Sequence, residues 1–160
     1  MTTFSYTDPE FREILDRTKV IAIVGVTTNP VRPSFYVARY LQLKGYRIVP
    51  VNPRLAGQCV LGQPILPSLD AASGEDVDMV DIFRRSSEAG AIVDQAISVL
   101  PNLKTIWMQI GVSDPEAAAR AEAIGLTVVM NRCPKIEYQR LYGELRIGGF
   151  NTGIVSSRIR

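Results

Sequence analysis

Residues 20–54, VIAIVGVTTNPVRPSFYVARYLQLKGYRIVPVNPR, decide the fold of this chain. Residues 20–24 form a continuous apolar run rich in β-branched side chains, as a parallel strand buried on both faces requires. Gly25 ends this run, and Pro33 stands where the first residue of a helix belongs. Residues 46–51 then return to a strand-like pattern. The stretch therefore predicts a strand, a loop, a helix and a second parallel strand.

Strand-like and helix-like segments continue to alternate along the chain. We expect further strands at residues 77–83, 103–107 and 126–130, and further helices at 8–17, 87–99, 115–124 and 134–142. Such alternation predicts an α/β fold, a Rossmann-like doubly wound sheet of about five parallel strands with helices on both faces. One domain is expected over residues 1–147, followed by a tail or arm over residues 148–160 that has no helical period.

Composition limits the classes of function. The 160 residues are 46% hydrophobic and 21% charged, as in an ordinary soluble globular protein, and no apolar run is long enough to span a bilayer. We expect a cytoplasmic protein without a membrane segment. A net charge of +2 argues against nucleic acid as a partner. Cys59 and Cys133 are isolated, which favours reduced thiols over a disulfide or a metal site.

The loop after the first strand narrows the class of ligand. A dinucleotide fingerprint needs three glycines here and an acidic residue near the end of the second strand. Gly25 stands alone, Arg54 occupies the acidic position, and the lysine of a phosphate-binding Walker loop is absent. The pattern favours a nucleotide with an extra ribose phosphate, with coenzyme A (CoA) as the first choice and NADP as the second.

Cationic residues follow the predicted strands on one side. The ends of the five strands carry Arg32, Arg54, Arg84, Arg85, Arg132 and Lys135. No aspartate or glutamate occurs in residues 26–36, 52–58, 84–87, 108–113 or 131–136. Because ligands of open α/β sheets bind outside the carboxyl ends of the strands, this edge predicts an anionic ligand with phosphate groups.

Four segments together resemble a known family. IVGVTTNPVRPSFYVARYLQLKGYRIVPVNP, VDMVDIFRR, IWMQIGV and GLTVVMNRC are similar to the stand-alone CoA-binding domain family and to the N-terminal domain of the succinyl-CoA synthetase α subunit. The resemblance covers about residues 8–145. It implies a Rossmann-like sheet of five strands that binds CoA at its carboxyl edge, without demonstrated catalysis for most members.

The resemblance also implies three groups of binding residues. The pyrophosphate loop would comprise Gly25, Val26, Thr27, Thr28, Asn29, Arg32, Pro33 and Ser34. The adenosine side would be contacted by Asn52, Pro53 and Arg54. The remaining wall would contain Phe83, Arg84, Arg85, Trp107, Gln109, Gly111, Arg132 and Cys133.

Catalysis is not expected, because the chain has no histidine for a phosphohistidine or an imidazole base. Cys133 precedes a helix start between two basic residues, an environment that favours thiolate, although a packed, unreactive thiol is the first choice. Asp78 and Asp81 are expected on one face of their strand, bonded to loop amides.

The leading hypothesis from the sequence is a module that binds, senses or carries CoA or acyl-CoA, with a homodimer as a further expectation. One alternative is acyl or persulfide transfer by Cys133 on a CoA thioester. A second alternative is an NADP-responsive regulator.

Overall fold

Five parallel strands form the central sheet in the computed structural model, which describes residues 5–143. They are β1 (Val20–Val24), β2 (Arg47–Val51), β5 (Met79–Ile82), β6 (Thr105–Met108) and β7 (Thr127–Val129), in the order β2-β1-β5-β6-β7. The chain turns from β1 to β2 on one side and back to β5 on the other, which makes the carboxyl ends of β1 and β5 the switch point of the sheet. The predicted Rossmann-like fold is confirmed, whereas the predicted tail lies outside the described residues.

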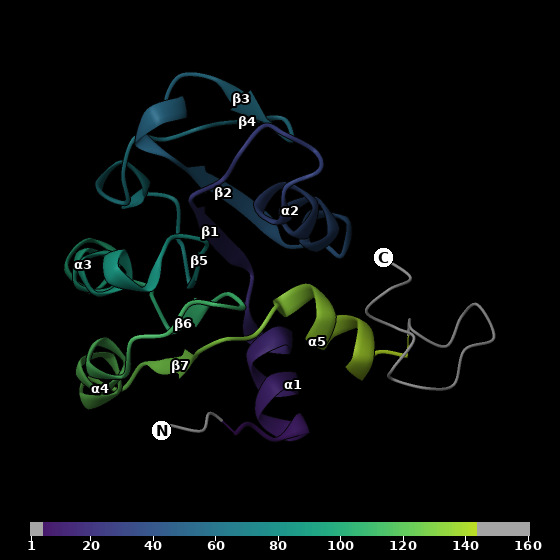
Figure 1. The fold of residues 1–160 in the computed structure, drawn as a ribbon, viewed down its shortest axis with the longest axis vertical. Coiled ribbons are helices and arrows are strands. Elements are labelled where there is room, and N and C mark those ends of the chain that lie inside the picture. The colour runs from purple at the N-terminus through teal and green to yellow at the C-terminus, as the bar shows by residue number, and fades with distance from the viewer. Residues whose placement is uncertain (1–4, 144–160) are drawn as a thin grey trace.

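Five helices cover both faces of this sheet (Figure 1). They are α1 (Asp8–Arg17), α2 (Pro33–Leu43), α3 (Ser86–Val99), α4 (Pro115–Ala123) and α5 (Pro134–Leu141). Helices α3 and α4 pack on one face, and α1, α2 and α5 pack on the other. Each face buries its own apolar cluster, so the sheet is covered on both sides as its apolar strands require.

Four strands are shorter than the sequence predicts: β2 begins at Arg47 instead of Tyr46, and β5 covers residues 79–82 of the expected 77–83. The Asp78 carboxylate, just before β5, accepts hydrogen bonds from the backbone N–H groups of Lys19 and Val20 at 3.0 Å. Residues 103–104 likewise precede β6, and β7 keeps only its central three residues. These differences leave the order and direction of the strands unchanged.

The connection between β2 and β5 is made mostly of loops and short turns. It contains two short 3₁₀ turns, η1 (Pro53–Leu55) and η2 (Asp70–Ala72). Between them, β3 (Cys59–Val60) and β4 (Gln63–Pro64) form a small antiparallel pair that the sequence pattern does not reveal. No helix within residues 5–143 has the length and apolar character needed to cross a membrane.

Candidate functional site

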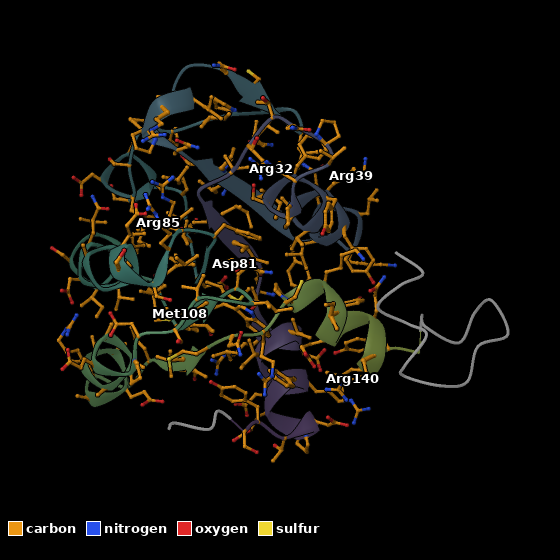
Figure 2. The ribbon with its side chains drawn as sticks, viewed as in Figure 1. Arg32, Arg39, Asp81, Arg85, Met108 and Arg140 are labelled. Carbon is orange, nitrogen blue, oxygen red and sulfur yellow. The ribbon has the colours of Figure 1, made fainter. Side chains whose placement is uncertain are left out.

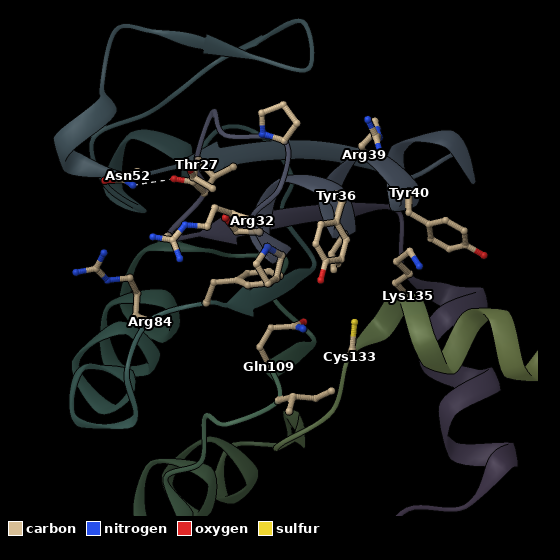
Figure 3. Close-up of a pocket in the computed structure, with 18 of the residues that line it drawn as sticks. Thr27, Arg32, Tyr36, Arg39, Tyr40, Asn52, Arg84, Gln109, Cys133 and Lys135 are labelled. Atoms are coloured by element: carbon tan, nitrogen blue, oxygen red, sulfur yellow. Dashed lines mark hydrogen bonds between the residues drawn. The ribbon is translucent and has the colours of Figure 1, made fainter. Parts of the chain in front are cut away.

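A pocket of about 1590 Å³ opens at the carboxyl ends of β1, β2, β5 and β6 and continues between α2 and α5 (Figure 3). This volume exceeds the ~300–1,000 Å³ of most small-molecule sites, so a long ligand can be accommodated. Of the residues expected at the site, the pocket is lined by Gly25, Val26, Thr27, Arg32, Pro33, Ser34, Asn52, Arg54, Phe83, Arg84, Gln109 and Cys133.

The loop after β1 leads directly into the N-terminus of α2. Gly25 has a φ of +93°, and a Cβ at this position would lie 2.9 Å from Cδ of Arg84. Glycine is therefore required both by the backbone conformation and by the approach of Arg84. Arg32 is the N-cap of α2 and Pro33 begins the helix, so the positive end of the helix dipole faces the pocket.

The helices differ in how their N-termini are capped. Side chains cap α1 and α4, through Thr7 and Asp114. Helices α2, α3 and α5 have no side-chain cap; their N-cap residues are Arg32, Arg85 and Cys133. Arg32 lines the pocket, so the first backbone N–H groups of α2 are available to an anionic ligand beside it, whereas the backbone N–H groups of Lys135 and Ile136 in α5 bond the Cys133 sulfur.

Six cationic side chains line the pocket: Arg32, Arg39, Lys44, Arg54, Arg84 and Lys135. None of the described lining residues is an aspartate or a glutamate. Within residues 5–143, the guanidinium groups of Arg32 and Arg54 form neither a hydrogen bond nor an ion pair. The wall therefore has a strong excess of positive charge, and two of its cations have no protein partner in the described part of the chain.

The expected acid-free edge is wrong at one point. Glu88 lies in the first turn of α3, directly after residues 84–87, which contain no acid. Its carboxylate binds Arg84 at 2.8 Å and Arg85 at 3.2 Å. The hydrogen bond from Arg84 lowers the pKa of Glu88, so this carboxylate offsets part of the local positive charge.

The remaining predicted site residues do not line the pocket; they are Thr28, Asn29, Pro53, Arg85, Trp107, Gly111 and Arg132. Trp107 is fully buried, contacts the ring of Phe11 at 5.7 Å and donates a hydrogen bond of 2.9 Å to the carbonyl of Arg132. The guanidinium of Arg132 lies over the ring of Tyr6, 5.3 Å from its centre. Core packing therefore accounts for Trp107, and Arg132 contacts Tyr6 outside the pocket lining.

Gln109 and Cys133 lie side by side on the wall of the pocket (Figure 3), and the fully buried Asp81 (labelled in Figure 2) lies within hydrogen-bond distance of the Gln109 amide. Burial raises the pKa of the Cys133 thiol, and the hydrogen bond with Gln109 only partly opposes this effect. Burial therefore supports the first choice from the sequence, a packed and unreactive thiol, because desolvation outweighs the neighbouring cations that would favour thiolate.

The expectation that Asp78 and Asp81 lie on one face of their strand is wrong. Residues three apart in a strand point to opposite faces, and the two carboxylates have different surroundings. Asp78 accepts from loop amides as expected, whereas Asp81 is fully buried and its pKa is well above the ordinary value because of desolvation.

One wall of the pocket was missed in the sequence, except for Lys135, which was expected among the cations at the strand ends. It is formed by helix residues Tyr36, Val37, Arg39, Tyr40, Leu43 and Lys44 of α2 with Lys135, Ile136 and Gln139 of α5, together with Pro30, Leu55, Ile110 and Val112 from loops. The ammonium groups of Lys44 and Lys135 lie 5.2 and 5.1 Å from the centre of the Tyr40 ring. The spacing of Tyr36, Tyr40 and Lys44, four residues apart on one helix face, is the signal that could have indicated this wall.

Comparisons with known proteins identify a family and a fold for this chain. The sequence model of the CoA binding domain family matches residues 19–139. The uncharacterized protein YneT of Bacillus subtilis (strain 168) is 34% identical over 129 residues, which cover 81% of this chain and 92% of YneT.

Two solved structures have similar folds. The crystal structure of Prb, a PH1109 protein redesigned for binding, has a TM-score of 0.82 and 36% identity, covering 91% of this chain and 99% of Prb. A hypothetical protein from Pyrococcus horikoshii OT3 has a TM-score of 0.80 and 35% identity, covering 89% of this chain and all of that protein (100%).

Proposed function

Because the chain belongs to the CoA binding domain family, we propose that it binds coenzyme A or an acyl-CoA in this pocket. The observation that carries the proposal is the pocket wall, in which six cations and no described carboxylate surround an elongated cavity. CoA is a long ligand with a pyrophosphate and a ribose 3′-phosphate. Guanidinium groups and open helix N-termini are the protein groups that suit phosphates.

The lining residues support one direction for the bound ligand. The pyrophosphate would lie at the loop after β1, near Arg32 and the N-terminus of α2. The adenosine and its 3′-phosphate would lie near Asn52 and Arg54 at the end of β2. The pantetheine arm would then extend toward Gln109 and Cys133, where the wall carries fewer charges.

Binding without chemistry is the role we propose for this pocket. The sequence offers no imidazole base, and the raised pKa of Cys133 leaves its thiol protonated and poorly nucleophilic. Transfer of an acyl or persulfide group by Cys133 remains the alternative, since this thiol lines the pocket. A cytoplasmic homodimer that carries or senses CoA remains our expectation for the physiological form.

Native mass spectrometry of the purified protein tests the proposal. CoA retained at one equivalent per chain supports it, and titration calorimetry with CoA and NADP then compares the two nucleotides directly. We expect CoA to bind at least tenfold more tightly than NADP. Tighter binding of NADP would favour a regulator that responds to that nucleotide, and absence of binding by CoA and acetyl-CoA would overturn the proposal.

A further inference from the structure

A buried carboxyl group, an amide and a thiol lie next to one another at the wall of the pocket. Asp81 is fully buried, whereas Gln109 and Cys133 are 7% and 5% exposed and line the pocket. With its amide nitrogen toward Asp81, Gln109 donates to Oδ1 at 3.1 Å and to Oδ2 at 3.3 Å. In the opposite orientation, with its amide nitrogen toward Cys133, the Gln109 side chain donates a hydrogen bond to the sulfur, which partly offsets the rise that burial causes in the pKa of this thiol. Gln109 therefore connects a group that a ligand cannot reach with one that it can.

The two orientations of the Gln109 amide suit different protonation states of Asp81. An ionised Asp81 only accepts hydrogen bonds, which holds the amide nitrogen toward Asp81 and turns the amide oxygen toward Cys133 and the pocket. A protonated Asp81 donates to the amide oxygen, which turns the amide nitrogen toward the pocket instead. Protonation of Asp81 thus exchanges an acceptor for a donor in the pocket wall.

The strands and α1 place no charge beside Asp81. Its partners on the neighbouring strands are Ile23 of β1 and Trp107 of β6, neither of which titrates in this range. The apolar side chain of Phe11 covers the same face from α1. Burial is the cause of the raised pKa of Asp81, without a contribution from another described charge.

The other two helices at this face, α2 and α5, contribute the titratable groups nearest to Asp81 and Gln109. The hydroxyl of Tyr36 points toward Gln109 and Cys133 from α2, and the Cys133 thiol faces Gln109 from the start of α5 (Figure 3). Lys135 of α5 instead directs its ammonium group to the Tyr40 ring. The proton that changes the amide orientation is therefore the one on the Asp81 carboxyl group, and Cys133 and Tyr36 are the other titratable groups near the Gln109 amide.

We propose that the Asp81–Gln109 pair selects between a CoA thioester and free CoA. The amide N–H that Gln109 presents when Asp81 is protonated suits the carbonyl oxygen of a thioester, and the amide oxygen presented otherwise suits the S–H of free CoA. Binding of a thioester then takes up one proton from solvent, which is held on the Asp81 carboxyl group. This inference rests on the proposed function and assigns Asp81 as a positioning residue that acts through Gln109.

The first experiment needs no CoA. The rate at which iodoacetamide alkylates Cys133 is measured against pH in a Cys59→Ser background, since Cys59 is exposed and would react as well. Asp81→Asn keeps the shape of the side chain and offers a permanent N–H to the Gln109 oxygen, so the alkylation profile should shift to lower pH, with a several-fold faster rate near pH 7.5. Adding Gln109→Leu should remove most of this shift.

Asp78→Asn is the matched control, because Asp78 lies beside the same strand but bonds the backbone of Lys19 and Val20 away from the pocket. Its alkylation profile should match that of the parent. An unchanged profile in Asp81→Asn would overturn the inference, as would an equally large shift in the presence of Gln109→Leu, because the effect would then not pass through the amide.

The second experiment compares acetyl-CoA with CoA by titration calorimetry from pH 5.5 to 8.5, in buffers that differ in ionisation enthalpy. The ratio of the two affinities should fall with rising pH, by up to about tenfold per pH unit above the pKa of Asp81. Acetyl-CoA should take up more protons than CoA, and Asp81→Asn should keep the preference for acetyl-CoA at every pH. A pH-independent ratio in the unaltered protein overturns the selection while leaving CoA binding intact. Failure of both ligands to bind overturns the proposed function itself.

Discussion

Asn52 donates a hydrogen bond of 2.8 Å from its side-chain amide to the carbonyl oxygen of Val26, which ties the end of β2 to the loop after β1. The other end of the same amide accepts from the backbone N–H of Arg54 at 2.9 Å. One buried side chain thus sets the backbone of both loops that line the cationic end of the pocket. The sequence predicted Asn52 as a ligand contact, and the structure gives it a positioning role as well.

Replacement of Asn52 by alanine should lower both stability and affinity for CoA. The carbonyl of Val26 would lose its partner in a buried position, which costs about 1–3 kcal/mol. Urea denaturation measures the loss of stability, and calorimetry measures the loss of affinity. Asn102→Ala is the control, because this exposed side chain bonds only Asp76 and should change the free energy of unfolding by no more than about 0.5 kcal/mol. Equal effects of the two substitutions would contradict the positioning role.

Arg54 should distinguish CoA from dephospho-CoA. Its guanidinium lines the pocket and has no partner within residues 5–143, so it is available to the 3′-phosphate. A hydrogen bond to a charged group contributes about 1.5–3 kcal/mol, which corresponds to a loss of about tenfold or more in CoA affinity for Arg54→Ala. Dephospho-CoA should bind both proteins equally in calorimetry. Arg47→Ala is a suitable control, because Arg47 pairs with Glu75 at the opposite end of β2. Equal affinities of the unaltered protein for both ligands would remove this assignment.

Arg32 should recognise the pyrophosphate. Arg32→Ala is expected to lower the affinity for CoA about tenfold or more, because one hydrogen bond to a charged group is lost. The affinity for pantetheine, which lacks the pyrophosphate, should stay almost unchanged. Calorimetry with both ligands measures the difference. Arg85→Ala serves as the control, because Arg85 is exposed, pairs with Glu88 and does not line the pocket. A parallel loss for CoA and pantetheine would indicate a collapsed loop instead of a lost phosphate contact.

Most of the fold follows from local sequence patterns. Most errors in the prediction arise where the structure depends on contacts between residues far apart in the chain. Apolar runs and helix-start prolines located every strand and helix of the main sheet. The start of β5 was predicted two residues too early, because the local pattern of Val77 and Asp78 does not show that the Asp78 side chain bonds Lys19 and Val20, almost sixty residues earlier in the chain. Local periodicity carries no information about such a contact.

The candidate site likewise has parts that local sequence patterns predict and parts that depend on distant contacts. The loops at the strand ends were found because the topology of a parallel sheet brings them together, whichever helices follow. The wall formed by Tyr40 of α2 and Lys135 of α5 was missed, apart from Lys135 itself, because it depends on how two helices, far apart in the chain, pack on one face. The sequence neighbours of Cys133 left a reactive thiolate open as an alternative, whereas burial by the whole fold raises its pKa, in agreement with the packed thiol that was the first choice.

Replacement of Asp81 by asparagine should stabilise the protein at high pH. The folded protein holds the Asp81 proton more tightly than the unfolded chain does, because burial raises the pKa of this carboxyl. The stability that the neutral acid contributes is complete below the unfolded pKa of about 3.9. It is lost as pH rises from there through the folded pKa, by about 1.4 kcal/mol for each pH unit between the two. Denaturation curves should therefore show a gain for Asp81→Asn that grows between about pH 4 and the folded pKa and is absent at lower pH. A gain of constant size across this range would contradict the raised pKa.

Cys133 should lie beside the bound ligand without reacting with the thioester of an acyl-CoA. Its pKa is raised by burial, so little thiolate exists near neutral pH, and the exposed Cys59 should be alkylated first by iodoacetamide. CoA at saturating concentration should protect Cys133 further, because this thiol lines the pocket, and should leave Cys59 unaffected.

Incubation with acetyl-CoA tests the same thiol for catalysis. Intact-mass analysis should find no acetyl adduct and no release of free CoA beyond that of a protein-free control, and Cys133→Ser should keep its affinity for CoA within about threefold, a difference of roughly 0.65 kcal/mol. Cys59→Ser is the matched control for the loss of a thiol. Formation of an acetyl adduct on Cys133 together with turnover to free CoA would replace the binding role by that of a thiol-dependent transferase. In that reaction the acetyl group leaves the sulfur of CoA, which is released as the free thiol, and forms a new thioester with the sulfur of Cys133.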